Sequence, residues 1–334
     1  MNPVAAELGH VPGGLRARLR VYRRVDPVRT GWQLGSTSAA YALAWVLAYF
    51  TLRHALWLMP LAVLLAAGFA IRLFLLMHDC GHRSLFHSPR VNDAAGTMIG
   101  YVVFFPFRFW QHYHAIHHAV AGDLDRPDGD VPFTMSVADY RRATPWNRRA
   151  YLLVRHPAVM FGFAFLYFLV IVRFPQSDSP PDVRRNIHAT TLVMAVTVAA
   201  ASLLIGFQTY VLVQLPIHVA ASAMGSWLMY VQHQFDGVYR VRQDEWDYVA
   251  AALRGSSHYS LPAIPQWFSA NIGFHHVHHL DPKIPNYNLQ LCHEENRDVF
   301  TTTKTVTTRD CWRMVRRPLY DEERRALVSA PDLS

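Results

Sequence analysis

The feature that most constrains this chain is a set of apolar stretches long enough to approach the thickness of a lipid bilayer. A transmembrane helix needs about 20 mostly apolar residues to cross about 30 Å of hydrocarbon. Four stretches come near that length, and they lie at about 36–52, 55–77, 188–206 and 208–231. We therefore predict an all-α integral membrane protein with four transmembrane helices.

Composition and charge agree with a chain that is partly embedded in lipid. Only 17% of the residues are charged, against about 25% in an average soluble domain. The net charge of +8 fits loops that face anionic lipid on the cytoplasmic side, and no nucleic acid partner is expected. Three cysteines, none in a CxxC pair, exclude a disulfide framework. Residues 1–35 lack the apolar core of a signal peptide and are predicted to be a basic cytoplasmic segment.

Two shorter apolar segments are not predicted to cross the membrane. Residues 95–107 are too few to cross and return, so we expect a re-entrant or interfacial piece. Residues 158–172 end at Arg173, and we place them at the interface, which leaves an even number of spans and both termini in the cytoplasm. The polar parts of 78–187 and 232–295 are predicted to form a cytoplasmic helical cap, followed by a cytoplasmic segment, 296–334.

Histidines gather in three short motifs, each close to the end of an apolar segment. The first is HDCGH, in which His78 and His82 share one helical face. The second, HAIHH, and the third, HHVHH, repeat one HxxHH spacing, in which we expect the three histidines to lie on one side of a helix. They supply six imidazoles: His114, His117, His118, His275, His278 and His279. A single histidine, His233, follows the last predicted span.

Such a concentration of imidazoles predicts bound metal. Nine neutral imidazoles buried without partners would be costly, and nine charged ones would repel one another. A structural zinc site takes four ligands and favours cysteine, so this number indicates two metals. Imidazole suits iron, zinc, copper and nickel, and the spans lack the ExxH pairs of ferritin-like carboxylate sites. Two iron ions held mainly by histidine are the best match, in a histidine-rich di-metal site within the cap.

The order of these motifs resembles that of the membrane fatty acid desaturases, and within them the bacterial acyl-lipid branch. The strings HDCGH, HAIHH, YVQHQF and NIGFHHVHHLDPKIPNYNL carry the resemblance, which covers residues 36–295 as one desaturase domain. It implies a di-iron centre and O2-dependent removal of two hydrogens from an acyl chain. The iron ligands that it implies are His78, His82, His114, His117, His118, His233, His275, His278 and His279. No catalytic residue beyond these ligands is predicted.

Residues beside the motifs are candidates for orienting the imidazoles. Asp79, Asp125 and Asn271 are candidates for hydrogen bonds to the second nitrogen of a ligand. In the acyl-CoA branch a water-bridging Asn precedes the isolated histidine by four residues, whereas this chain has Met229 there. Either Asn271 or a water would fill that role, or the site differs here in detail. The extra histidines, His87, His112 and His276, are interpreted as supporting or surface groups.

The resemblance also implies partners and a location. Substrates are an acyl lipid and O2 within the membrane lipids. No GxGxxG motif is evident, so a separate electron donor such as ferredoxin is expected, in a multi-pass protein of the bacterial plasma membrane. Two alternatives remain: a related hydroxylase or ketolase acting on acyl lipid or carotenoid, and a histidine-rich membrane metal transporter.

Overall fold

The computed structural model describes residues 13–126 and 134–330, so residues 1–12 of the predicted N-terminal segment lie outside it. The chain is mostly helical, as predicted. Its longer helices are α3 (Pro27–His54), α4 (Met59–His82), α5 (Pro89–Val102), α6 (Phe107–Val120), α8 (Pro145–Arg155), α11 (Pro181–Ile205), α12 (Phe207–His233) and α16 (Asn286–Glu295). The shorter ones are α2 (Gly13–Leu19), η2 (Arg20–Arg23), η3 (Leu56–Leu58), α7 (Val137–Arg142), α9 (Pro157–Gly162), α10 (Ala164–Leu169), η4 (Ile171–Arg173), η5 (Gln243–Glu245), α13 (Tyr248–Arg254), α14 (Ala263–Phe268), α15 (His275–Leu280) and α17 (Thr308–Met314).

Five short strands accompany the helices in the described residues, and the all-α prediction did not include them. β1 (Met135–Ser136) pairs in parallel with β4 (Leu319–Asp321), which pairs antiparallel with β5 (Ala326–Val328). β2 (His258–Tyr259) pairs in parallel with β3 (Thr305–Val306). Each strand has only two or three residues, and it pairs with a strand that is distant in the sequence or lies across a turn. Such short strands carry no alternating pattern that would predict them.

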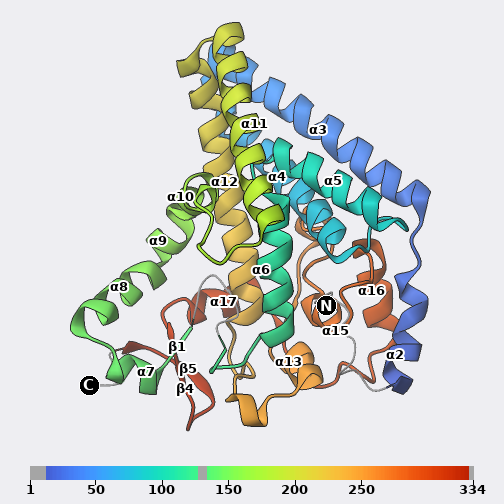
Figure 1. The fold of residues 1–334 in the computed structure, drawn as a ribbon, viewed down its shortest axis with the longest axis vertical. Helices are drawn as coiled ribbons and strands as arrows, with labels where there is room; N and C mark the ends of the chain where they lie inside the picture. The colour runs from blue at the N-terminus through green and yellow to red at the C-terminus, as the bar shows by residue number, and fades with distance from the viewer. Residues whose placement is uncertain (1–12, 127–133, 331–334) are drawn as a thin grey trace.

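Three helices are long and apolar enough to cross a membrane: Leu56–His82, Pro181–Ile205 and Phe207–His233. Figure 1 shows α11 and α12 as an upright pair and α3 sloping away from their upper end. The predicted span 36–52 lies inside α3, which has sufficient length, but the first half of α3 carries Arg29, Gln33 and several hydroxyl residues. Three of the four predicted spans therefore have the required length and composition, and the fourth stays a prediction.

Helix α4 lies at the centre of the molecule, where it packs against α3, α5, α6 and α12. Ala66, Ala67 and Ala70 are buried in it, and small side chains allow neighbouring helices to approach closely. The helix ends immediately after His82 because Arg83 adopts a left-handed conformation, with φ of 57°, and its N–H donates to the carbonyl of Cys80. Both histidines of the first motif therefore lie in the last turns of this helix.

The two short apolar segments fold as short pieces, in agreement with their prediction as non-spanning. Residues 95–107 form the end of α5 and a turn into α6, and Phe104 adopts a positive φ of 55° in that turn. Residues 158–172 form α9, α10 and η4. The tips of the two pieces are joined, because Arg173 donates hydrogen bonds to the carbonyls of Phe104 and Phe168.

The helix that carries the third histidine motif is held to the N-terminal region by one hydrophobic cluster. Leu19 and Tyr22 pack with Val277 and Leu280 of α15 and with Leu289 of α16. Figure 1 shows α2, α15 and α16 together at the lower right of the molecule. This cluster fixes α15, which carries the third histidine motif.

We predict that Gly81→Ala destabilises the protein by about 1–3 kcal/mol, because overpacking in a dense core costs that much. A Cβ at Gly81 would lie 2.2 Å from Cζ3 of Trp110, so α4 and α6 would have to separate. The matched control is Gly35→Ala in α3, where nothing lies within 4 Å of the new Cβ. Thermal unfolding in detergent measures both variants. Equal melting temperatures would contradict the proposed packing.

Candidate metal centre

Four helices bring the nine predicted ligands together. His78 and His82 come from the end of α4, and His114, His117 and His118 come from α6. His233 is the last residue of α12, and His275, His278 and His279 lie on α15. Eight of the nine are buried and His114 is half-buried. The structure thus gathers side chains that are up to 201 residues apart in the sequence.

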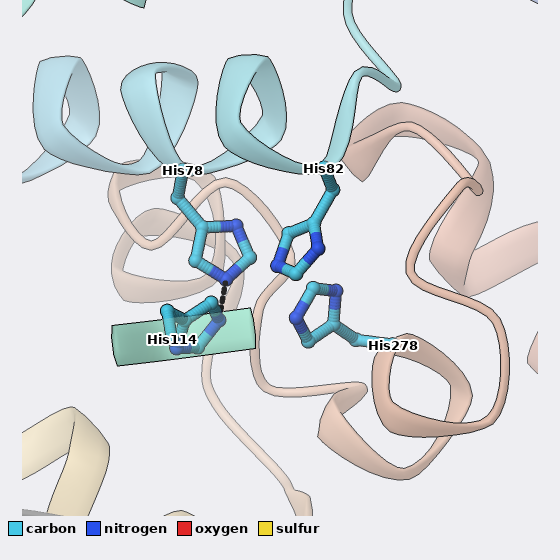
Figure 2. A group of neighbouring side chains, drawn as sticks. All are labelled: His78, His82, His114 and His278. Atoms are coloured by element: carbon cyan, nitrogen blue, oxygen red, sulfur yellow. Dashed lines mark hydrogen bonds between the residues drawn. The ribbon is translucent and has the colours of Figure 1, made fainter. Parts of the chain in front are cut away.

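The imidazoles form two adjacent groups. Group A contains His78, His82, His114 and His278, and group B contains His117, His233, His275 and His279. Within each group the candidate ligand atoms all lie within 4.8 Å of one another. The Nε2 atom of His118 lies 3.1 Å from that of His114 and 3.0 Å from that of His278, so His118 joins group A. Figure 2 shows four members of group A turned toward one another, two from α4 above and one each from α6 and α15.

Each HxxHH motif serves both groups, which corrects the expectation that its three histidines act on one side. In α6 the i and i+4 residues, His114 and His118, face group A, whereas His117 faces group B. In α15 the assignment is reversed, so that His275 and His279 face group B and His278 faces group A. Two helices with the same spacing therefore bridge two neighbouring sites.

The distances between the ring nitrogens fit metal coordination. Neighbouring Nε2 atoms are 3.1 Å apart for His114 and His78, and 2.9 Å apart for His275 and His233. His117 Nε2 lies 3.2 Å from the Nε2 atoms of both His233 and His279. Two nitrogens bound to one ion at about 2.1 Å and at right angles would be about 3 Å apart. The buried Nε2 of His82 has no hydrogen-bond partner among the described residues, as expected of a ligand atom.

Burial keeps the imidazoles in the form that binds metal. The pKa values of His114, His118, His275, His278 and His279 are lowered well below 6.5, first by burial and then by neighbouring histidines. A neutral imidazole offers a lone pair, whereas a protonated one does not. The donor set is nitrogen alone, which suits a borderline transition metal such as iron. The residues therefore fit a pair of metal ions, one in each group.

Comparison with known proteins decides the family. The fatty acid desaturase family model matches residues 55–309. The chain is 38% identical to a fatty acid desaturase of Bacillus subtilis, over 96% of this chain and 92% of that protein. It is 26% identical to an sn-1 oleoyl-lipid 12-desaturase of Synechocystis over 75% and 72% of the two chains, and 24% identical to a chloroplastic omega-6 fatty acid desaturase of Glycine max over 81% and 63%. The chain belongs to the fatty acid desaturase family. It is a desaturase enzyme.

Backbone and amide groups orient two imidazoles of this desaturase. His233 Nδ1 lies 3.0 Å from the carbonyl oxygen of Gly255, so Nδ1–H donates there and Nε2 is left for a metal. Asp79 lies 3.4 Å from His78 Nδ1 through one carboxylate oxygen. Its other oxygen accepts from the backbone N–H and the side-chain amide of Asn286, at 2.9 and 2.8 Å. Gly255 and Asn286 were not predicted; only the position of Asn286 at the start of the NYNL string hinted at its role.

The other two orienting candidates lie elsewhere. Asp125 is paired with Arg242 at 2.7 Å and accepts from the backbone N–H of Gln243, because the loop after α6 turns to the surface at Gly122. Asn271 bonds to Gln266 and to the carbonyl of Asn286, so its link to an imidazole is indirect. The extra histidine of the third motif, His276, is fully buried and bonds to His293 at 2.9 Å, away from both groups.

An apolar cavity leads to the two groups. Its main chamber, of about 130 Å³, lies between α4, α6, α10 and α12, and an adjoining chamber of about 40 Å³ reaches His78, His233 and His275. Both chambers are lined by Ile71, Phe74, Trp110, His114, His117 and Met229, among others. Trp110 stacks on His114 with ring centroids 4.3 Å apart, so one wall of the cavity is also a support for group A.

We predict that the metal-free desaturase loses stability in mild acid. The five histidines named above have pKa values well below 6.5 when folded and about 6.5 when unfolded, so the unfolded chain binds more protons below that pH. Stability is therefore retained above pH 6.5 and lost as the pH falls below about 6.5. The measurement is thermal unfolding of chelator-treated protein between about pH 7.5 and about pH 5.5. A melting temperature that stays constant or rises toward acid would contradict neutral burial.

Proposed function

We propose that this desaturase uses two iron ions, one in group A and one in group B, to introduce a double bond into a lipid-linked acyl chain. The observation that supports this most strongly is the apolar cavity, which runs from the spanning helices to the nitrogens of both groups. We further propose that it lies in the bacterial plasma membrane with both termini in the cytoplasm.

The shape of the cavity suits a fatty acyl chain. Residues between His218 and Met229 of α12 line one wall, and the eleven steps of α helix between these two residues extend about 16 Å. Aromatic rings of Phe74, Phe105 and Phe109 line the opposite side. A metal transporter would place polar ligands along a path through the bilayer. Here three ligands lie in the last turns of the long apolar helices α4 and α12 and the other six lie outside those helices, which favours an enzyme that draws its substrate from the lipid.

The side chains of this enzyme would hold the metal and position the substrate. Iron bound by these nitrogens would supply the chemistry of O2 reduction and of hydrogen removal from unactivated methylenes, which side chains alone do not perform. The imidazoles of groups A and B keep the ions beside the cavity. Trp110 and Phe74 exclude water from the methylenes that lie there, and Gly225 leaves room for them opposite Ile71.

The balance of the reaction requires a partner. Removing two hydrogens from an acyl chain while reducing O2 to two waters needs two further electrons and two protons. The described part of the chain shows no flavin or nicotinamide fold. We propose that a separate small donor, a ferredoxin, supplies the electrons. The Synechocystis relative is named for oleoyl-lipid, and by that likeness we propose an acyl group carried on lipid.

We predict that His117→Ala and His278→Ala each lower metal content and reduce desaturation more than about 100-fold, because each removes a ligand atom from one group. His276→Ala is the matched control: it is as buried as these two but faces away from both groups. It should keep its metal. The measurements are iron per chain by elemental analysis and desaturation of membrane lipids. Full activity in either ligand variant would contradict its assignment.

We predict that expression in a host of known lipid composition yields new double bonds, detected by mass spectrometry of fatty acid methyl esters. Gly225→Leu should abolish this product while retaining the metal, because the added side chain would occupy the cavity while all nine imidazoles are kept; a Cβ there already lies 3.3 Å from Ile71. Hydroxylated or keto products would contradict desaturation. Unchanged product from Gly225→Leu would show that the acyl chain reaches the metals by another route.

A further inference from the structure

One side of the molecule combines exposed tryptophans with exposed arginines. Helix α8 turns Tyr151 and Arg155 into the protein, and its other face exposes Trp146, Leu153 and Val154. Trp146 is 76% exposed, although tryptophan is among the most apolar side chains. A solvated surface gives no physical reason for three large apolar side chains on one helix face.

Helix α17 places a second tryptophan at the same side and ties it to a spanning helix. Trp312 is 55% exposed, and its ring centroid lies 4.9 Å from that of Trp227 on α12. Phe161 of α9 packs against both rings, at 5.4 Å from Trp227 and 6.4 Å from Trp312. Since Trp227 lies six residues before His233, this contact lies at the histidine end of the span, where the membrane surface must be.

Exposed arginines accompany these tryptophans on α8 and on and after α17. Arg149 on α8 and Arg309, Arg313 and Arg316 on and after α17 are exposed. Across residues 13–126 and 134–330, none of the four has a carboxylate oxygen within 4.0 Å. Interleaved arginine and tryptophan on a helix face is typical of segments that lie in the headgroup layer of a membrane.

The same surface continues beyond α9 into the exposed apolar side of α10 and η4. Phe163, Leu166, Val170, Ile171 and Phe174 are exposed along α10 and η4. Figure 1 shows α8, α9 and α10 as one run that climbs toward the α11–α12 pair. The arginine-tryptophan face is therefore continuous with a surface that leads to the spanning helices.

We propose that α8, α9 and α17 form a docking face that lies in the headgroup layer of an anionic leaflet, on the side of the histidine groups. The arginines would meet lipid phosphates, while Trp146, Leu153 and Trp312 enter the layer above the acyl chains. An acidic protein would match the positive charge but would not explain why these apolar side chains are exposed, so lipid is the better fit. This inference does not depend on the proposed reaction, and its failure would leave that reaction standing.

The test uses the full chain in lipid nanodiscs of phosphatidylcholine, with or without phosphatidylglycerol. A nitroxide is attached at Leu153→Cys, and because Cys80, Cys292 and Cys311 are buried, labelling is selective. Collision of the label with O2, which concentrates in lipid, is compared with collision with a water-soluble nickel chelate. We expect membrane-like values in discs that contain phosphatidylglycerol and a shift toward water in phosphatidylcholine alone.

Two triple variants distinguish the effect of the arginines on this face from the effect of lowering the net charge of the protein. Arg149→Gln, Arg313→Gln and Arg316→Gln together should remove the effect of phosphatidylglycerol, since each arginine near an anionic surface contributes about a fivefold preference for the docked state. The control is Arg20→Gln, Arg24→Gln and Arg297→Gln, which are exposed arginines on the side of α2 and α16, and it should retain the effect. A label that stays in water in both lipids would overturn the proposal. The proposal would also be overturned if the label became inaccessible to the nickel chelate only after reduced ferredoxin was added, because the face would then bind a protein.

Discussion

The structure depends on the packing of buried imidazoles at distances that suit metal coordination better than ordinary contacts. Neighbouring Nε2 atoms lie 2.9–3.2 Å apart in both groups, and eight of the nine rings are removed from water. Buried polar atoms need partners, and imidazoles that converge through the same nitrogen satisfy one another poorly. Bound metal would supply the missing partner for every ring at once. The fold can therefore be understood as a support for these nitrogens.

The C-terminal ends of the long apolar helices α4 and α12 place ligands of both groups. α4 stops at Arg83 directly after its second histidine, and α12 ends on His233, so two helices that are long and apolar enough to cross a membrane carry ligands in their last turns. α6 and α15 add the remaining ligands and share them between the groups. The apolar cavity reaches the same histidines from between the helices, so a hydrocarbon chain bound in it would lie beside the nitrogens.

Much of this was predictable from local spacing, and the rest depends on contacts between distant segments. The three histidine motifs could be recognised from their i, i+3 and i+4 spacing, whereas the full set of nine ligands, with the isolated His233, was implied by the resemblance to the desaturases. Their division into two groups depends on how α6 and α15 are rotated about their axes, which spacing does not encode. Asn286 reaches Asp79 across 207 residues. Asp125 was predicted to orient an imidazole, but the turn at Gly122 carries it to Arg242. The short strands and the helical conformation of the polar first half of α3 were not predicted for the same reason. Tertiary contacts, rather than periodicity, define these elements.

The most direct test of the central claim is X-ray absorption spectroscopy of the purified, iron-loaded protein combined with a metal count. The account predicts two irons per chain, each surrounded mainly by imidazole nitrogens at about 2.1 Å, with no sulfur among the ligands. A single iron per chain, or a first coordination shell dominated by sulfur or by oxygen alone, would contradict it.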